Sequence, residues 1–334
     1  MNSFLNEENR NTQALPSRNL AKERLQIAAP ALGTVFIFVG AMVFQFLIAF
    51  LVALFAPWAI EKDWYTVVLS TLPMYLFAMP LSLFFYRLGK AEPPARKKMS
   101  VPVWLGLMAI SFAMSYFGNF IGLFVNAILS LITGEPPVND LQALTTTTPF
   151  WANLLFLGIL APIMEELFYR KLVIDRLRRY GDLPAILISG IAFGLIHGNF
   201  YQFFYAAMLG MFFGYIYLNT GKIRHTIFLH MGINLVGGVF ASEMIKLLDL
   251  ELLTSDPLAA LAQNTVGVVM YLLYVMFIGA VFIGALVAAI ILFLRKRKPL
   301  QKAAHPLTAR EWVAVGVCNP AVWIFVLVTV LLFL

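Results

Sequence analysis

The chain has 334 residues, of which 61% are hydrophobic and 12% charged, and its mean hydropathy is +0.83. This composition excludes a water-soluble globule with a polar shell and requires lipid as the solvent. A net charge of +7 would fit nucleic acid as a partner, but in a membrane protein it more often reflects topology. Because Cys318 is the one cysteine, neither a disulfide framework nor a thiolate zinc cluster is expected.

Residues 1–29 form a polar arm of mixed charge without the pattern of a cleaved signal peptide. Apolar segments of spanning length follow, since about 20 apolar residues cross a bilayer core of about 30 Å. We predict nine helices, at 30–57, 65–86, 101–131, 150–178, 183–199, 201–219, 222–247, 263–294 and 313–334. Residues 133–149 read as a flexible connector, and the last segment would also fit a re-entrant or interfacial helix.

The sequence therefore predicts an all-α, polytopic membrane bundle of about eight to nine transmembrane helices around a buried polar chamber. With the N-terminus in the cytoplasm, 22 of the 24 lysine and arginine residues fall on the inner side, leaving Lys62 and Lys246 outside. This asymmetry favours that orientation and explains the net charge without nucleic acid, which we do not expect as a partner.

Two adjacent acids, Glu165 and Glu166, lie within the fourth apolar segment. Carboxylates at membrane depth are expensive and by default mark a functional site facing the bundle interior. The alternative is that this helix ends early, leaving the pair at the interface, but the apolar pattern continues past it. Arg170 is four residues after Glu166 and can pair with it on one helix face, while Glu165 is turned about 100° away.

Two histidines accompany the acids. His197 closes the fifth segment, four residues after Phe193, and His230 lies in the seventh, four residues before Asn234. A single buried histidine is more often structural than catalytic. At 1.5 Å per residue, however, Glu165, His197 and Asn234 lie roughly 20 Å from the cytoplasmic ends of their helices, with His230 about 12 Å in. We therefore expect these groups to converge in one chamber.

These residues resemble the motifs of the CAAX protease and bacteriocin-processing (CPBP, or Abi) family of intramembrane peptidases, which includes the prenyl-protein CAAX endopeptidase. The match consists of EExxxR at residues 165–170, FxxxH at 193–197 and HxxxN at 230–234, in this order and on separate hydrophobic helices. The resemblance covers about residues 150–240. It departs at Lys171, where many members have glycine, and it divides the chain into N-terminal transmembrane helices (30–147), a catalytic core (148–247) and C-terminal transmembrane helices (248–334).

The resemblance implies hydrolysis of a peptide bond near the membrane surface. By matching position, Glu165 would be the general base that activates water, assisted by His197. His230 and Asn234 would stabilise the oxyanion, and Glu166 and Arg170 would orient the site. A zinc ion held by Glu165, His197 and His230 is an open alternative, although we lean towards no tightly bound metal.

Two other classes of protein remain as alternatives. A proton-coupled transporter could use the same acids and histidines as a relay, with Pro162 as the hint of a broken helix. A non-catalytic family member could act as a bacteriocin immunity factor or a membrane scaffold. For an enzyme, we expect a membrane-associated peptide or protein as the substrate and the lipid bilayer of a bacterial plasma membrane as the surroundings. A peptide precursor is favoured over a prenylated CAAX protein, and the oligomeric state is left open.

Overall fold

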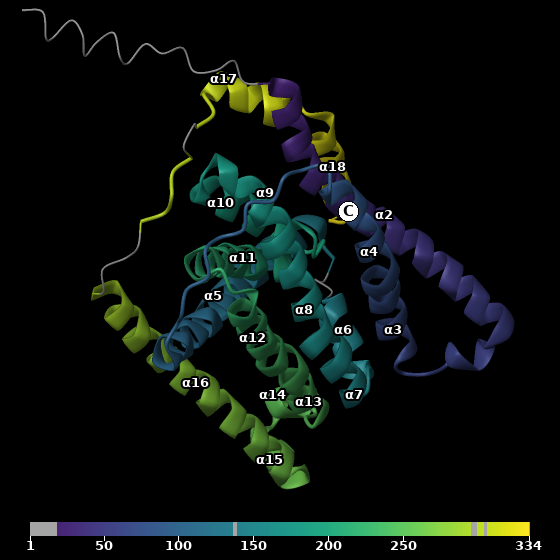
Figure 1. Ribbon diagram of the computed structural model, residues 1–334. Helices are drawn as coiled ribbons and strands as arrows, with labels where there is room; N and C mark the ends of the chain where they lie inside the picture. Colours follow the sequence, from purple (N-terminus) through teal and green to yellow (C-terminus); the bar gives the residue numbers. More distant parts are fainter. Residues whose placement is uncertain (1–18, 136–138, 295–298, 304–305, 334) are drawn as a thin grey trace, which may run out of the picture.

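The computed structural model describes residues 19–135, 139–294, 299–303 and 306–333, and within these ranges all regular structure is helical (Figure 1). The described helices that are long and apolar enough to cross a membrane are Leu20–Phe55, Tyr65–Tyr86, Val101–Thr133, Phe150–Tyr180, Phe200–Thr220, Ile223–Lys246 and Thr265–Ile291. A bent pair, Ala309–Val317 and Pro320–Leu331, makes an eighth span if it is counted as one. The structure thus confirms the predicted all-α polytopic membrane bundle.

Three of these spans are built from consecutive helical pieces. The first comprises α3 (Tyr65–Leu72), a π-helical segment (Pro73–Ala78) and α4 (Met79–Tyr86). The second comprises α7 (Phe150–Ala152), α8 (Ala161–Glu166) and α9 (Asp175–Leu177), joined by π-helical segments at Asn153–Leu160 and Leu167–Ile174 and followed by a 3₁₀ turn (Arg178–Tyr180). The third comprises α12 (Ile223–Asn234), a π-helical segment (Leu235–Phe240) and α13 (Ala241–Lys246).

The other main helices are α2 (Leu20–Phe55), α5 (Val101–Thr133), α10 (Asp182–Leu195), α11 (Phe200–Thr220), α16 (Thr265–Leu294) and α18 (Pro320–Leu331). Short helices complete the chain: the 3₁₀ turn Pro57–Ala59, α6 (Asp140–Thr147), α14 (Leu250–Ser255), α15 (Pro257–Gln263), α17 (Ala309–Trp312) and a π-helical segment at Val313–Val317.

The two ends of the chain depart from the predicted boundaries. The first helix starts at Leu20, inside the stretch expected to be a polar arm, with the Asn19 side chain accepting hydrogen bonds from two backbone N–H groups of its first turn; residues 1–18 of that arm lie outside the described residues. The last predicted segment, 313–334, is bent by 61° at Cys318 and Asn319. This segment is therefore not one straight helix, and the bend fits either a broken span or the re-entrant helix that the sequence left open.

Two interior predictions also need correction. Segment 183–199 contains only the 14-residue helix α10, which is about 21 Å long and shorter than a bilayer core of about 30 Å. The connector expected at 133–149 contains helix α6, whose first turn is capped by the side chain of Asn139. This helix was not predicted because its polar, threonine-rich sequence has only a weak apolar pattern.

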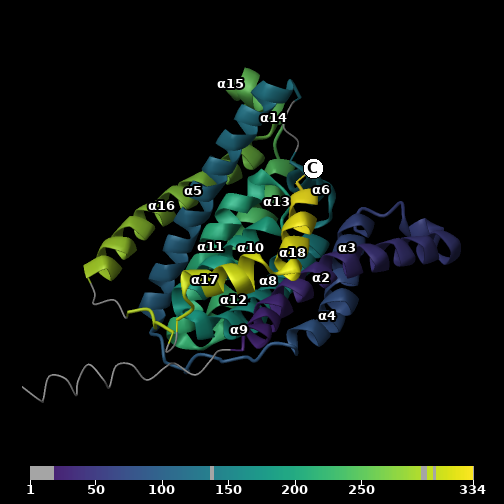
Figure 2. The same ribbon diagram turned by 90° about the horizontal axis from the view of Figure 1, so that it is seen from above.

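A central group of helices, α8 and α10 to α12, lies between two outer groups (Figure 2). On one side α11 packs on α5, and α5 packs on α16; on the other side α2 packs on α4 and α18. The hydrophobic core runs through the central group and includes Phe168, Ile174, Phe193 and Tyr217. The same central helices carry the polar motif residues, of which Glu166, Arg170 and His230 are buried.

Small residues allow the central helices α10 and α11 to approach closely. A Cβ atom added at Gly190 would lie 2.7 Å from the backbone nitrogen of Met211, and one at Gly194 would lie 2.8 Å from the Cβ of Ala207. Small residues at such crossings are typical of membrane helices, which associate by close van der Waals packing. The turn between α10 and α11 is thereby held against the core, and this turn contains His197.

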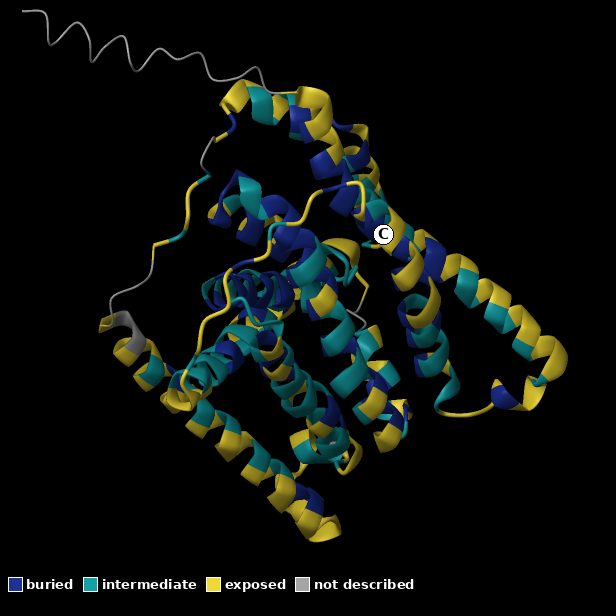
Figure 3. Ribbon diagram, viewed as in Figure 1, coloured by how far each residue is buried: buried dark blue, intermediate teal, exposed yellow. Residues whose placement is uncertain are grey.

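The outer helices are exposed along much of their length (Figure 3), and large apolar residues are prominent among their exposed positions. Phe46 and Phe50 of α2, Phe120 of α5, and Met276 and Ile283 of α16 are all more than half exposed. A soluble monomer rarely shows continuous apolar surface of this extent. Lipid is the solvent that these outer faces fit, in agreement with the composition.

Candidate active site

The two acids lie in α8, a short α-helical stretch between two π-helical segments of the same span. Pro162 is in the first turn of α8, where its missing N–H interrupts the ladder of backbone hydrogen bonds. Segments of π-helix inside a longer helix are frequently found at functional sites. Pro162 and the two π-helical segments thus interrupt the regular α-helix beside Glu165 and Glu166, at the point where the two acids face the neighbouring helices.

Glu166 and Arg170 form a fully buried ion pair, as their spacing predicted. The Nε and Nη2 atoms of Arg170 donate to the two carboxylate oxygens of Glu166 at 2.9 and 3.0 Å, and both side chains are 0% exposed. The third guanidinium nitrogen, Nη1, donates to Ser189 Oγ at 3.3 Å, and Ser189 donates in turn to the Tyr169 carbonyl. A two-pronged pair of this kind fixes the orientation of the carboxylate.

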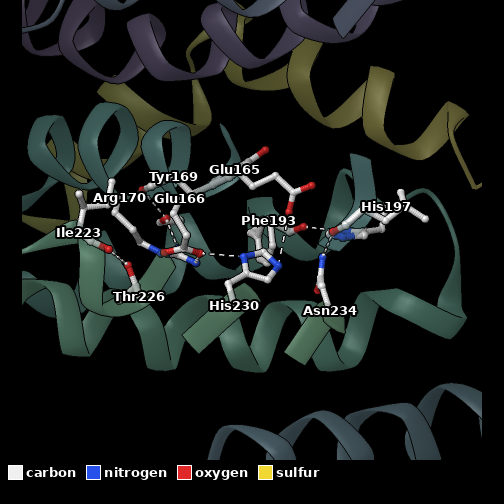
Figure 4. Close-up of polar contacts among 12 residues, drawn as sticks. Glu165, Glu166, Tyr169, Arg170, Phe193, His197, Ile223, Thr226, His230 and Asn234 are labelled. Atoms are coloured by element: carbon white, nitrogen blue, oxygen red, sulfur yellow. Dashed lines mark hydrogen bonds and ion pairs between the residues drawn. The ribbon is translucent and has the colours of Figure 1, made fainter. Parts of the chain in front are cut away.

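His230 lies between the two carboxylates (Figure 4). Its Nδ1 atom is 3.2 Å from Oε1 of Glu166, and its Nε2 atom is 3.7 Å from Oε2 of Glu165. Because Glu166 is paired with Arg170 it is ionised and can only accept, so His230 Nδ1 carries a proton and donates it. The other ring nitrogen, Nε2, faces Glu165.

Glu165 is the accessible member of the acid pair, with a side chain 14% exposed. Its Oε1 atom accepts a hydrogen bond of 3.4 Å from the hydroxyl of Tyr75, which lies in the π-helical segment of the span Tyr65–Tyr86. Sequence reasoning missed Tyr75, since a tyrosine in an apolar span carries no motif. Ser189 was missed for the same reason.

His197 lies just past the end of α10, in the turn that precedes α11. Its Nδ1 atom is 2.8 Å from the Phe193 carbonyl, which can only accept, so Nδ1 carries the proton and Nε2 keeps a free lone pair. The Phe193 ring lies edge-on to both imidazoles, with centroids 5.1 Å from His197 and 5.6 Å from His230. Gly198, at φ 64°, supplies the left-handed backbone that the turn requires.

Asn234 lies one turn after His230 at the end of α12, and its side-chain amide donates to the Leu157 carbonyl at 2.9 Å. This bond uses one of the two N–H groups of the amide. Four of the predicted residues thus form one connected group: Glu165, Glu166, Arg170 and His230. The Phe193 ring packs against both imidazoles and so lies between His197 and this group. Asn234 is hydrogen-bonded to the π-helical segment Asn153–Leu160, which contains Leu157.

The structure does not assemble the alternative zinc site. Within the described parts of the chain, no three histidine, cysteine or acidic side chains are grouped as metal ligands. Glu165 Oε2 and His230 Nε2 lie 3.7 Å apart, whereas the Nδ1 atom of His197 is 2.8 Å from the Phe193 carbonyl.

The fold and the site define a polytopic helical membrane protein with a buried cluster of two glutamates, an arginine and two histidines. Residues 147–236 match the family model of the type II CAAX prenyl endopeptidase Rce1-like proteins. This finding confirms the resemblance to the CPBP family that the three motifs predicted, and it supports a membrane peptidase at the level of the family.

Curated relatives match over part of the chain. The chain is 26% identical over 146 residues to the "Putative membrane peptidase YdiL" of Bacillus subtilis (strain 168), a match spanning 42% of this chain and 60% of that protein. It is 26% identical over 148 residues to the UPF0177 protein YxdF of Lactococcus lactis subsp. lactis (strain IL1403), spanning 44% of this chain and 78% of the relative. No solved structure matches the chain significantly.

Proposed function

We propose that this protein is an intramembrane endopeptidase that hydrolyses a peptide bond in a membrane-associated peptide or protein. The main support for the proposal is that the two adjacent glutamates differ in burial and in their partners. Arg170 neutralises the buried Glu166, whereas Glu165 is partly exposed and faces the Nε2 atom of His230. One carboxylate therefore organises the site and the other is available for acid–base chemistry.

The proposed reaction begins with water bound beside Glu165 and His197. Glu165 takes a proton from the water, helped by the free Nε2 of His197, and the water oxygen attacks the carbonyl carbon of the substrate. The carbonyl oxygen becomes an oxyanion, which accepts hydrogen bonds from protonated Nε2 of His230 and from the second N–H of Asn234. Glu165 then gives its proton to the leaving nitrogen, the C–N bond breaks, and a carboxylic acid and an amine are released.

The family description and the peptidase name of the Bacillus subtilis relative support this reaction class for the chain. The bacterial origin of the relatives supports a bacterial plasma membrane as its location. We favour a membrane-tethered peptide precursor as the substrate, with a prenylated C-terminal peptide as the alternative within the same reaction class.

The test is cleavage by the purified full chain in lipid vesicles. Substrates are a library of acyl-tethered peptides and a matched set carrying a prenylated cysteine, read by mass spectrometry. The Glu165→Gln variant should lower kcat by about 10² to 10⁴, the range lost with a general base. The His225→Gln variant is the control for replacing an ionisable side chain outside the site. His225 lies on α12, like His230, but near the other end of that helix.

Equal cleavage by wild type and the Glu165→Gln variant would overturn the proposed mechanism. Absence of any cleavage by a folded wild type, for all substrates, would favour the immunity or scaffold role. A chelator added to each reaction reports separately on whether a metal ion takes part.

A further inference from the structure

The site reaches beyond the segment that matches the family model. Tyr75 belongs to the span Tyr65–Tyr86, whereas the match covers residues 147–236. Its side chain is buried, with 3% exposed, and its hydroxyl donates to Oε1 of Glu165 at 3.4 Å. A residue from an N-terminal helix thus contacts the group proposed as the general base.

Tyr75 and His230 contact opposite oxygens of the same carboxylate. Tyr75 approaches Oε1, and His230 Nε2 lies 3.7 Å from Oε2. Both distances are longer than a strong hydrogen bond to a carboxylate, which is about 2.5–2.7 Å for a hydroxyl donor. Contacts in a site without substrate are often long and tighten when substrate binds. The two contacts therefore define the plane of the Glu165 carboxylate without locking it.

The backbone around Tyr75 explains how its side chain comes to face Glu165. Pro73 opens a π-helical segment, Pro73–Ala78, in the middle of an otherwise α-helical span. The widened turn changes the side-chain register at this point, and π-helical segments of this kind are concentrated at functional sites. Two such segments flank α8, so irregular helix is found on both sides of this contact.

We propose that Tyr75 is a positioning residue that orients Glu165 through a hydrogen bond to Oε1. This inference rests on the proposed function, because it assigns a role in the same reaction. Tyr75 holds one carboxylate oxygen so that the other faces the water and His230. The opposing interpretation is that Tyr75 only fills the core, as other buried tyrosines do.

The chain offers a matched control for this distinction. Tyr86 lies in the same span, is 1% exposed and also has a hydroxyl partner, Thr34 Oγ1 at 3.1 Å, in a position outside the site. The Tyr75→Phe and Tyr86→Phe variants each remove one buried hydroxyl and keep the ring. Steady-state cleavage in vesicles then gives kcat and KM, and thermal unfolding checks that each variant is folded.

We expect the Tyr75→Phe variant to lower kcat about tenfold with KM unchanged, as for the loss of one hydrogen bond to a charged group. The Tyr86→Phe variant should keep both constants. Adding Tyr75→Phe to the Glu165→Gln variant should lower single-turnover cleavage no further, because Tyr75 acts through the Glu165 carboxylate.

Wild-type kcat in a folded Tyr75→Phe variant would overturn the role of Tyr75 and leave the proposed peptidase intact. An equal loss of kcat in both phenylalanine variants, or a further loss in the double variant, would also overturn it. If the wild type cleaves no substrate at all, the proposed function fails and this inference fails with it.

Discussion

At the residue scale, the site is defined by the different environments of two neighbouring glutamates. Glu166 is fully buried and paired with Arg170, whereas Glu165 has a partly exposed side chain and only long contacts. A buried pair is costly to break because one charge is left without a partner in an apolar medium. The pair should therefore matter for folding, and Glu165 for activity.

The first prediction at this scale concerns Arg170. The Arg170→Met variant leaves the Glu166 carboxylate buried without its cation, and we expect the free energy of unfolding to fall by about 3–5 kcal/mol. Unfolding in detergent micelles, followed by circular dichroism, measures this change. Adding Glu166→Gln should recover part of the loss, because the orphaned charge is then removed.

Lys171 is the matched control for Arg170. It follows Arg170 in the sequence and pairs with Asp175 at 3.5 Å, but its own side chain is 42% exposed. Asp175 is buried, but it also accepts a hydrogen bond of 2.8 Å from the Tyr217 hydroxyl and keeps this partner when Lys171 is replaced, so we expect the Lys171→Met variant to lose at most about 1 kcal/mol of unfolding free energy. Similar losses for Arg170→Met and Lys171→Met would contradict the central role of the buried pair.

The motif residues could be found from the sequence because charged and imidazole side chains are rare in apolar spans. Spacing also predicted correctly that Glu166 would pair with Arg170. Tyr75 and Ser189 could not be found, because tyrosine and serine are ordinary in membrane helices and their roles depend on which helices meet. The bond from Asn234 to the Leu157 carbonyl depends on a π-helical backbone that periodicity does not reveal.

At the element scale, the hairpin of α10 and α11 places His197. The short α10 ends at Leu195, and a turn with Gly198 at positive φ leads into α11, whose first turn is capped by Asn199. The helix predicted to reach residue 199 was too long, although the polar run His197, Gly198 and Asn199 already interrupts the apolar segment. Hydropathy indicates which residues favour a lipid environment, but it does not indicate where the backbone stops being helical.

The prediction at this scale concerns Gly190 in α10. A Cβ there would contact the Met211 side chain and lie 2.7 Å from the Met211 backbone nitrogen and 3.1 Å from the Ala207 carbonyl oxygen. Backbone atoms cannot move aside cheaply, so we expect the Gly190→Ala variant to lose about 1–3 kcal/mol of unfolding free energy. Cleavage should fall as well, because His197 lies in the turn that follows α10.

Gly279 in α16 provides the comparison for Gly190, since a Cβ there meets nothing within 4 Å. Alanine is a better helix former than glycine by about 0.5–1 kcal/mol, so the Gly279→Ala variant should be as stable as the wild type or slightly more stable. Thermal unfolding of the two variants side by side tests this contrast. A Gly190→Ala variant as stable as Gly279→Ala would show that the two helices can separate without loss.

At the scale of the whole molecule, the connecting segments at one end of the helix bundle are hydrogen-bonded to the ends of helices. The connector between α4 and α5 is bonded by Glu92 N–H to the Asp175 carbonyl at 2.6 Å and by Lys97 N–H to the Thr220 carbonyl at 2.8 Å. Gln301 accepts from Asp182 N–H and donates its own N–H to the Asp182 carboxylate. These connectors contain many of the basic residues, whereas α14 and α15 lie at the opposite end (Figure 2).

Composition and hydropathy predicted the fold class and the order of the spans, because the demands of a bilayer are uniform along the chain. They could not predict the bend at Asn319, where the side chain bonds to the Arg24 and Val315 carbonyls. One of these partners is at the other end of the sequence. Long-range contacts of this kind decide the path of the last helices.

The orientation in the membrane is the last prediction, and the single cysteine makes it testable. In a Cys318→Ser background, single cysteines are introduced by Ser100→Cys, before α5, and by Ser255→Cys, at the end of α14, both at exposed serines. The excess of basic residues on the Ser100 side predicts that this side faces the cytoplasm. A membrane-impermeant maleimide should therefore label the Ser255→Cys variant in intact cells and the Ser100→Cys variant only after permeabilisation. The reverse pattern would invert the topology, and labelling of both in intact cells would mean that these two connectors lie on one side of the membrane.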